Sequence, residues 1–318
     1  MKTLVTGASG FIGRPLTAAL AQAGHAVRAA VRDRRGQHFP PGVEIAMQPD
    51  LANPVFWAPL VAGMDAVVHL AGIAHVGLDV SESTYDRVNH MATAELVRAA
   101  AAAGVQRFVF MSSTRAQAGT AADEPVTETN EPRPTDAYGR SKLAAEAAVR
   151  AAGVPYTILR PALVYGPGAK GNFASLMRLT SLPVPLPFGA FPNRRSLLAL
   201  DNLIAAVHFA LEDPRATNET FLVADPKAIS VAELVAMLRA AAGRKPWLIP
   251  VPPGALGLAL RMIGQREAYE RLAGALVAEP NKLMAAGWQP VIDTESAIRQ
   301  MVQAASPRKS GTASRSTP

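Results

Sequence analysis

Three glycines spaced by three residues follow the first apolar run of the chain, and they constrain its fold more than any other feature. Residues 2–6 read as a buried strand and residues 14–23 as a helix packed on a sheet, with Gly7, Gly10 and Gly13 between them. Glycine permits a tight bend and a close backbone approach, and a helix N-terminus offers unpaired N–H groups to an anion. Such turns also occur for steric reasons alone. In this place the turn predicts a dinucleotide-binding site, although its spacing differs from the usual Gly-x-Gly-x-x-Gly.

Strand and helix patterns alternate through the first half of the chain. Strand-like runs lie at 2–6, 26–31, 43–47, 65–70, 107–112 and 155–160, and helical patterns at 14–23, 84–103 and 137–152. Gly24, Gly104 and Gly153 follow the three helices, at positions where glycine commonly ends a helix. The alternation predicts an α/β fold, a Rossmann doubly wound parallel sheet with helices on both faces.

The pattern changes after residue 160. Residues 161–192 are rich in glycine and proline and read as loop-rich substrate-binding structure. A helix at 201–211, a strand at 219–223, a helix at 230–242 and an apolar lid or packing helix within 247–263 follow. We expect a dinucleotide-binding domain at 1–160 with contributions from about 193–212, a smaller mixed C-terminal substrate-binding domain at 161–192 and 213–305, and a disordered tail at 306–318.

Composition narrows the class of protein. The chain has no cysteine, which excludes disulfides, thiolate nucleophiles and cysteine metal sites, and we expect no metal. Met1 and Lys2 lead directly into the first strand and leave no room for a signal peptide. No apolar stretch reaches the ~18–20 residues that a membrane span needs. We therefore expect a cytoplasmic protein without a transmembrane segment.

The formal net charge of +7 does not by itself identify a partner. Part of the charge lies in the tail, and elsewhere basic and acidic residues are mixed without an aromatic-interleaved basic stripe, so we expect no nucleic-acid partner. A basic balance fits an anionic small molecule and a weak attraction to a membrane surface equally well. A homodimer is a candidate assembly.

Tyr138 and Lys142 are the first candidate catalytic pair. Residues four apart share one face of a helix, so the tyrosine hydroxyl and the lysine ammonium can converge. A neighbouring cation favours the phenolate, which moves the pKa of tyrosine toward the range of a general acid/base. A surface tyrosine and lysine without a role is the alternative for a single Tyr-x-x-x-Lys.

Ser113 is the third candidate. It follows the apolar run 108–111, and ligands of parallel sheets lie at the carboxyl ends of the strands. A hydroxyl there can bind a substrate oxygen, or it can simply cap the end of the strand.

The glycine turn, the strand-end serine and the Tyr-x-x-x-Lys pair occur in the order and spacing of a known family. The chain resembles the extended short-chain dehydrogenase/reductase family over residues 1–300, within it the NAD-dependent epimerase/dehydratase branch and its UDP-sugar 4-epimerase and 4-ketoreductase subgroup. The resemblance implies that Ser113 and Tyr138 bind the reacting sugar oxygen, while Lys142 binds the nicotinamide ribose and tunes Tyr138. It implies an NAD(P) site of Gly7, Ser9, Gly10, Phe11, Ile12, Gly13, Arg32, Asp50, Leu51, Leu70, Ala71, Gly72, Asn89, Tyr138, Lys142 and Pro161.

Two further residues match the substrate site of the family. Asn172 and Arg194 stand where the family holds the substrate diphosphate, which implies a nucleotide-sugar substrate, of UDP type. A plain turn residue at 172 and a solvated arginine pair at 194–195 are the alternatives.

The chain departs from two subgroups of the family. The sugar 4,6-dehydratases carry an Asp-Glu pair after the strand-end hydroxyl, where this chain has Thr114 and Arg115, so dehydration is disfavoured. Ala74 replaces a lysine of the best-known UDP-galactose epimerases, which weakens the case for that housekeeping activity.

The second strand ends in Val31-Arg32-Asp33, where the type of dinucleotide is selected. An acidic residue accepts the ribose hydroxyls of NAD, whereas an arginine can pair with the 2′-phosphate of NADP. We expect NAD(P) as the cofactor and favour NADP slightly, because Arg32 stands in the phosphate position. A surface role for Arg32 is the alternative.

We therefore expect a nucleotide-sugar oxidoreductase that acts at sugar carbon 4 with Tyr138 as general acid/base, in surface-polysaccharide biosynthesis. An epimerase and a 4-ketoreductase need the same residues, and the sequence does not separate them. An NADP-dependent reductase of a non-sugar carbonyl compound and a non-catalytic dinucleotide-binding regulator are the alternatives.

Overall fold

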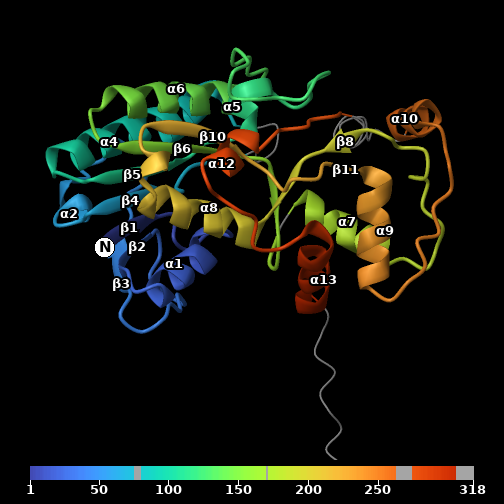
Figure 1. Cartoon of the computed structure of the whole chain (residues 1–318), viewed down its shortest axis with the longest axis horizontal. Helices are drawn as coiled ribbons and strands as arrows, with labels where there is room; N and C mark the ends of the chain where they lie inside the picture. The colour runs from blue at the N-terminus through green and yellow to red at the C-terminus, as the bar shows by residue number, and fades with distance from the viewer. Residues whose placement is uncertain (75–79, 170, 263–273, 306–318) are drawn as a thin grey trace, which may run out of the picture.

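A parallel sheet of seven strands forms the centre of the larger part of the protein (Figure 1). The computed structural model describes residues 1–74, 80–169, 171–262 and 274–305. The order across the sheet is β10-β6-β5-β4-β1-β2-β3. Its strands are β1 (Lys2–Thr6), β2 (Ala26–Val31), β3 (Glu44–Met47), β4 (Ala66–His69), β5 (Arg107–Met111), β6 (Tyr156–Pro161) and β10 (Glu219–Val223). The strand order reverses between β1 and β4, and ligands of doubly wound sheets bind at this switch point.

Helices cover both faces of the sheet, and each face has its own apolar core (Figure 1). One face is covered by α1 (Gly13–Gln22) and α8 (Leu200–Glu212), and the other by α2 (Ala58–Val61), α4 (Ala92–Ala102) and α6 (Ala137–Ala151). Successive strand residues point to opposite faces. Val5 and Val68 accordingly lie in the first core, whereas Leu4 and Val67 lie in the second. Burial on both faces explains why these strands are continuous apolar runs.

The fold class predicted from the sequence is confirmed. All six strands expected in the first half form within two residues of their predicted bounds. Gly24, Gly104 and Gly153 have φ angles of +87°, +72° and +75°, which is the left-handed conformation expected of a glycine after a helix. The strand expected at 219–223 also forms, and it extends the large sheet by pairing with β6.

Smaller elements build the rest of the protein. Two short sheets pair β7 (Leu163–Tyr165) with β9 (Leu197–Ala199) and β8 (Arg194–Arg195) with β11 (Ile229–Ser230). The helices outside the two main layers are α3 (Glu82–Tyr85), α5 (Thr114–Ala118), α7 (Asn172–Thr180), α9 (Val231–Ala241), α10 (Pro253–Met262), α12 (Asn281–Ala285) and α13 (Thr294–Ala305), and a π-helical turn spans Asp86–Met91. Within the described part of the chain, no helix is long and apolar enough to cross a membrane. The tail expected to be disordered, 306–318, lies outside the described residues.

Candidate functional site

The glycine turn lies at the carboxyl end of β1, directly beside the end of β4. Gly7 has a φ of +66°, and a side chain there would lie 3.0 Å from the backbone nitrogen of Ala71. A side chain on Gly13 would overlap the carbonyl oxygen of Gly7. No side chain caps α1, and among the described residues the backbone N–H groups of Phe11, Ile12 and Gly13 have no acceptor, so they are available to an anion. The turn therefore fits the pyrophosphate of a dinucleotide.

A buried hydrogen-bond chain runs from this turn across the sheet. The Thr93 hydroxyl donates to the carbonyl oxygen of Asn89 (2.6 Å), so it accepts from Nε2 of His69 (3.0 Å). Nδ1 of His69 is then the acceptor for the Thr6 hydroxyl (2.7 Å), which itself accepts from the Ala71 backbone N–H (3.2 Å). Every proton in the chain therefore has a defined position. The chain joins the residue before Gly7 to the π-helical turn.

The side chain of Asn89 continues the connection to α6. Its Oδ1 accepts from the backbone nitrogen of Ile73 (2.9 Å), and its Nδ2 donates to the Ile73 carbonyl (3.0 Å) and to the Ser141 hydroxyl (3.1 Å). The Ser141 hydroxyl donates to the Tyr138 carbonyl (2.8 Å). A side chain on Gly72 would lie 2.7 Å from Oδ1 of Asn89, so a larger residue there would displace this hydrogen-bonded amide. Asn89 thus fixes the 70–73 segment relative to the helix of Tyr138.

Tyr138 and Ser113 come together at the carboxyl end of β5. Ser113 caps α5 by accepting from the backbone nitrogen of Arg115 (3.2 Å), and Asp136 caps α6 by accepting from that of Gly139 (2.8 Å). The Arg115 guanidinium forms an ion pair with Asp136 and lies 5.9 Å from the centre of the Tyr138 ring. The two caps and the ion pair position both hydroxyl groups.

Burial raises the pKa of Tyr138, while a hydrogen bond with the Ser113 hydroxyl and the nearby Arg115 cation lower it. The expected net lowering of this pKa is therefore wrong in the free protein, because burial of the phenol has the largest effect. The cation that favours the phenolate is Arg115, a residue that the sequence marked only as a departure from the dehydratases.

Lys142 lies on the same face of α6 and also points to the end of β5. Its Nζ donates to the carbonyl of Met111 (2.9 Å) and lies 4.9 Å from the ring centre of Phe110. Burial lowers the pKa of Lys142 to about 8, and the Glu146 carboxylate acts in the opposite direction. Burial, with the Lys142 cation nearby, lowers the pKa of His69 to about 3, so this imidazole is neutral at physiological pH.

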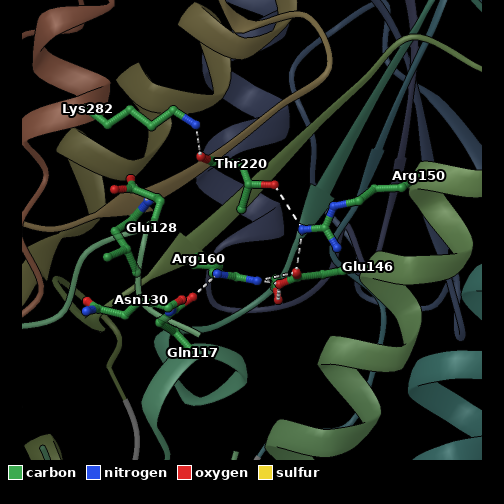
Figure 2. Close-up of polar contacts among 10 residues, drawn as sticks. Gln117, Glu128, Asn130, Glu146, Arg150, Arg160, Thr220 and Lys282 are labelled. Atoms are coloured by element: carbon green, nitrogen blue, oxygen red, sulfur yellow. Dashed lines mark hydrogen bonds and ion pairs between the residues drawn. The ribbon is translucent and has the colours of Figure 1, made fainter. Parts of the chain in front are cut away.

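A buried ion-pair network underlies this site (Figure 2). Glu146 of α6 accepts from Nε (2.8 Å) and an Nη (2.6 Å) of Arg160, which reaches over from β6. The same carboxylate accepts from the Ser112 hydroxyl (2.5 Å) and from Arg150 (2.9 Å). Arg160 also donates to the side chain of Gln117 on α5. The network holds α5, which Ser113 caps, and α6, which carries Tyr138, against the sheet.

The two arginines of β8 point to different surroundings. Arg194 is half-exposed and donates to Glu233 (3.2 Å) and to the Ala228 carbonyl (2.5 Å). Arg195 is less exposed, and its guanidinium group donates to the carbonyls of Gly274 (2.5 Å) and Thr120 (3.5 Å). Burial and, to a smaller extent, the Arg115 cation lower the pKa of Arg195. Adjacent strand residues point in opposite directions, which separates the two guanidinium groups. The sequence assigned the substrate to Arg194, with a solvated Arg194–Arg195 pair as the alternative, and that assignment stays a prediction.

The other predicted residues lie in two groups. Asp50 is exposed and accepts from the backbone nitrogen of Ala52 (3.1 Å), while Leu51 is buried. Ser9, Gly10, Phe11 and Ile12 form the turn before α1, Leu70, Ala71 and Gly72 follow β4, and Pro161 ends β6. Asn172 begins α7.

Arg32 and Asp33 differ in their contacts. Arg32 is exposed, and among the described residues no hydrogen bond or ion pair holds its side chain. The Asp33 carboxylate is bound by Arg35 (3.1 Å), whose hydrogen bonds lower the pKa of Asp33. Arg14 at the start of α1 donates to Gln37 (2.8 Å), which brings a second guanidinium to the same loop.

The fold and the site together define a dinucleotide-binding Rossmann protein with hydroxyl groups gathered at the strand ends. The model of the NAD dependent epimerase/dehydratase family matches residues 3–224. The UDP-glucose 4-epimerase of Vibrio cholerae is 35% identical over 313 residues, which are 95% of this chain and 94% of that protein. The chain belongs to the NAD dependent epimerase/dehydratase family.

Two further similarities concern a curated relative and a solved structure. The N-acetyl-alpha-D-glucosaminyl-diphospho-ditrans,octacis-undecaprenol 4-epimerase of Escherichia coli O157:H7 is 29% identical over 264 residues, 80% of this chain and 77% of that protein. The structure of MoeE5 in complex with UDP-glucose and NAD has a TM-score of 0.75 at 25% identity and covers 96% of this chain and 98% of that one. The predicted family and its NAD(P) cofactor are thus confirmed, whereas the preference for NADP stays a prediction.

Proposed function

We propose that this protein oxidises or reduces carbon 4 of a UDP-linked hexose or N-acetylhexosamine, as a 4-epimerase or a 4-ketoreductase, in surface-polysaccharide biosynthesis. The observation that carries the proposal is the gathering of Tyr138, Ser113 and Lys142 at the carboxyl end of β5. Lys142 donates to Met111, the last residue of that strand, and Arg115, whose backbone donates to Ser113, lies over the Tyr138 ring. Relatives named as UDP-glucose 4-epimerase and MoeE5 with UDP-glucose support the substrate class.

The chain's own residues would handle the proton of the reacting hydroxyl group. Bound NAD(P) would supply the acceptor or donor of a hydride at the neighbouring carbon. Tyr138 takes the hydroxyl proton, or returns it, and Ser113 holds the same oxygen by a hydrogen bond. Arg115 stabilises the phenolate. Lys142 would hold the ribose hydroxyls of the bound dinucleotide with its ammonium group.

The parts of the chain after residue 160 would hold the nucleotide end of the substrate. We assign the substrate-binding part to 161–192 and 213–305, and the dinucleotide-binding part to 1–160 with 193–212. Arg194 and Arg195 are both candidates for the substrate diphosphate. To bind it, Arg194 would give up Glu233, and Arg195 would give up the carbonyls of Gly274 and Thr120. Asn172 is the second candidate from the sequence.

One pair of assays tests the activity. In the first assay, the purified protein is denatured and the released nucleotide is identified. In the second, fresh protein is mixed with UDP-glucose or UDP-N-acetylglucosamine, and separately with a UDP-4-keto-6-deoxy sugar and NADPH. Retained NAD and an epimerised sugar without net redox change identify the epimerase. Stoichiometric loss of NADPH identifies the 4-ketoreductase. Loss of NADPH only with non-sugar carbonyl compounds, or no turnover of any substrate, would overturn the proposal.

Arg32 supplies a separate prediction about the cofactor. Arg32→Gln should weaken the binding of NADPH by about tenfold or more and leave NADH binding nearly unchanged, because it removes a charge-assisted hydrogen bond to the 2′-phosphate only. The measurement is a fluorescence titration of each reduced dinucleotide. Arg34→Gln, in the same exposed loop, is the matched control. Equal losses for NADPH and NADH would contradict the NADP preference.

A further inference from the structure

The helix α10 lies at one end of the molecule (Figure 1). Several apolar side chains on α10 and on the segments before it are exposed to solvent. Trp247 is 58% exposed, Leu258 62% and Met262 74%. Exposed basic residues stand within a few positions of these three apolar residues in the sequence. We call this surface the α10 face and define it as Leu182, Val184, Arg244, Lys245, Trp247, Ile249, Leu258, Arg261 and Met262.

The buried side chain of Arg239 holds the backbone of two segments of the α10 face in place. Arg239 of α9 is buried, and its guanidinium donates to the carbonyls of Pro246 (3.0 Å), Trp247 (3.4 Å), Leu182 (3.0 Å) and Val184 (2.5 Å). One buried cation therefore joins two exposed segments that are far apart in the sequence. Trp247 also has a φ of +43°, a conformation that is costly for a bulky side chain. The fold thus maintains Trp247 in solvent at a conformational cost.

The two segments also pair directly. The backbone nitrogen of Leu186 donates to the Trp247 carbonyl (3.1 Å), and that of Ile249 donates to the Leu186 carbonyl (2.9 Å). In α10, Leu256 packs against the apolar cluster that contains Leu186. Leu258 and Met262 are four residues apart and share the outward side of the helix. The segment of Trp247 and the helix α10 are therefore both attached to the apolar cluster that contains Leu186.

The charged residues in two described stretches at this end are all basic. The stretches 171–195 and 241–262 contain six arginines and lysines and no aspartate or glutamate. Arg244, Lys245 and Arg261 are exposed, and no ion pair holds them within the described residues. A second copy of the chain would place these like charges against one another, which disfavours self-association through this face.

Exposed tryptophan, leucine and methionine next to unpaired basic groups are suited to the boundary between lipid headgroups and acyl chains. We propose that the α10 face docks on the surface of a bilayer that contains anionic lipids, with Trp247, Leu258 and Met262 inserted at the headgroup level. Arg244, Lys245 and Arg261 lie against the lipid phosphates. This inference does not rest on the proposed activity.

Trp247 is also the probe for the test. Of the three tryptophans, Trp57 and Trp288 are buried, so a change in emission on vesicle addition reports Trp247. Phosphatidylcholine vesicles with added phosphatidylglycerol should shift the emission to shorter wavelength and sediment the protein, and high salt should reverse both. Pure phosphatidylcholine should bind much less. Equal binding to both vesicles, or no shift with either, would overturn the proposal.

Variants show whether vesicle binding depends on the α10 face or only on the positive net charge of the whole protein. Replacing both Arg244 and Lys245 by glutamine should lower the vesicle partition coefficient by about tenfold or more. The double variant L258S with M262S should lower it by a similar factor. The controls are R133Q combined with R299Q, and F56S, which removes a 77% exposed apolar side chain elsewhere. Dinucleotide binding checks that each variant is folded. Equal losses in face and control variants, or a change of oligomeric state caused by L258S with M262S, would contradict lipid docking.

Discussion

Tyr138→Phe should lower kcat by about 10²–10⁴-fold, the usual contribution of a positioned general acid/base. The substitution keeps the aromatic ring, so the contacts with Tyr85 (ring centres 6.0 Å apart) and Arg115 remain. KM should change little, because only the proton-transfer group is removed. Initial rates over a range of substrate concentrations, with the substrate that the assays above identify, give both constants.

Tyr85→Phe is the matched control for this variant. It removes a hydroxyl from the neighbouring buried tyrosine without touching the Tyr138–Ser113 pair. Its kcat should stay within a few-fold of the original value, and both variants should unfold at similar temperatures. Full activity of Tyr138→Phe, or an equal loss in both variants, would show that another group transfers the proton.

Glu146→Ala should destabilise the protein by about 3–5 kcal/mol, because removal of one partner leaves a buried charge uncompensated. The Glu146 and Arg160 side chains are 0% and 3% exposed, so solvent cannot replace the lost partner. The variant also removes the acceptor of the Ser112 hydroxyl, next to Ser113. Urea unfolding at constant pH, followed by circular dichroism, measures the free energy of unfolding.

Two comparisons make the Glu146 result specific. Glu131→Ala breaks an exposed pair with Arg133 and should change stability little. Combining Glu146→Ala with Arg160→Met should be less destabilising than the sum of the two single changes, because no uncompensated buried cation remains. A small loss in Glu146→Ala, or strict additivity in the double variant, would mean that solvent or neighbouring groups compensate Arg160.

The sequence predicted the large sheet well because two-sided burial leaves a strong signal. Each strand is a short apolar run, and Gly24, Gly104 and Gly153 mark the ends of its helices. The helix α7 was missed inside a stretch read as loops, since glycines and prolines on either side of Asn172–Thr180 dominated the pattern. The strands β8 and β11 have two residues each, too few for a period to be visible.

The site was predictable only where it depends on local spacing. Helical spacing places Tyr138 and Lys142 on one face, and the strand end places Ser113 near them. The contacts of Arg195 with Thr120 and Gly274 join residues 75 and 79 positions apart in the chain, and no local pattern encodes them. The roles assigned to these residues stay predictions until the variants are measured.

The hydrogen-bond chain through His69 has a consequence for redesign of the cofactor region. Thr6, His69 and Thr93 each have their donor and acceptor groups used, and the imidazole is held in one tautomer. An isolated replacement of any of the three leaves a neighbour with an unmatched proton or lone pair in a dry interior. Library designs should therefore exchange the three positions as one block, with apolar triplets among the choices, and not scan them one at a time.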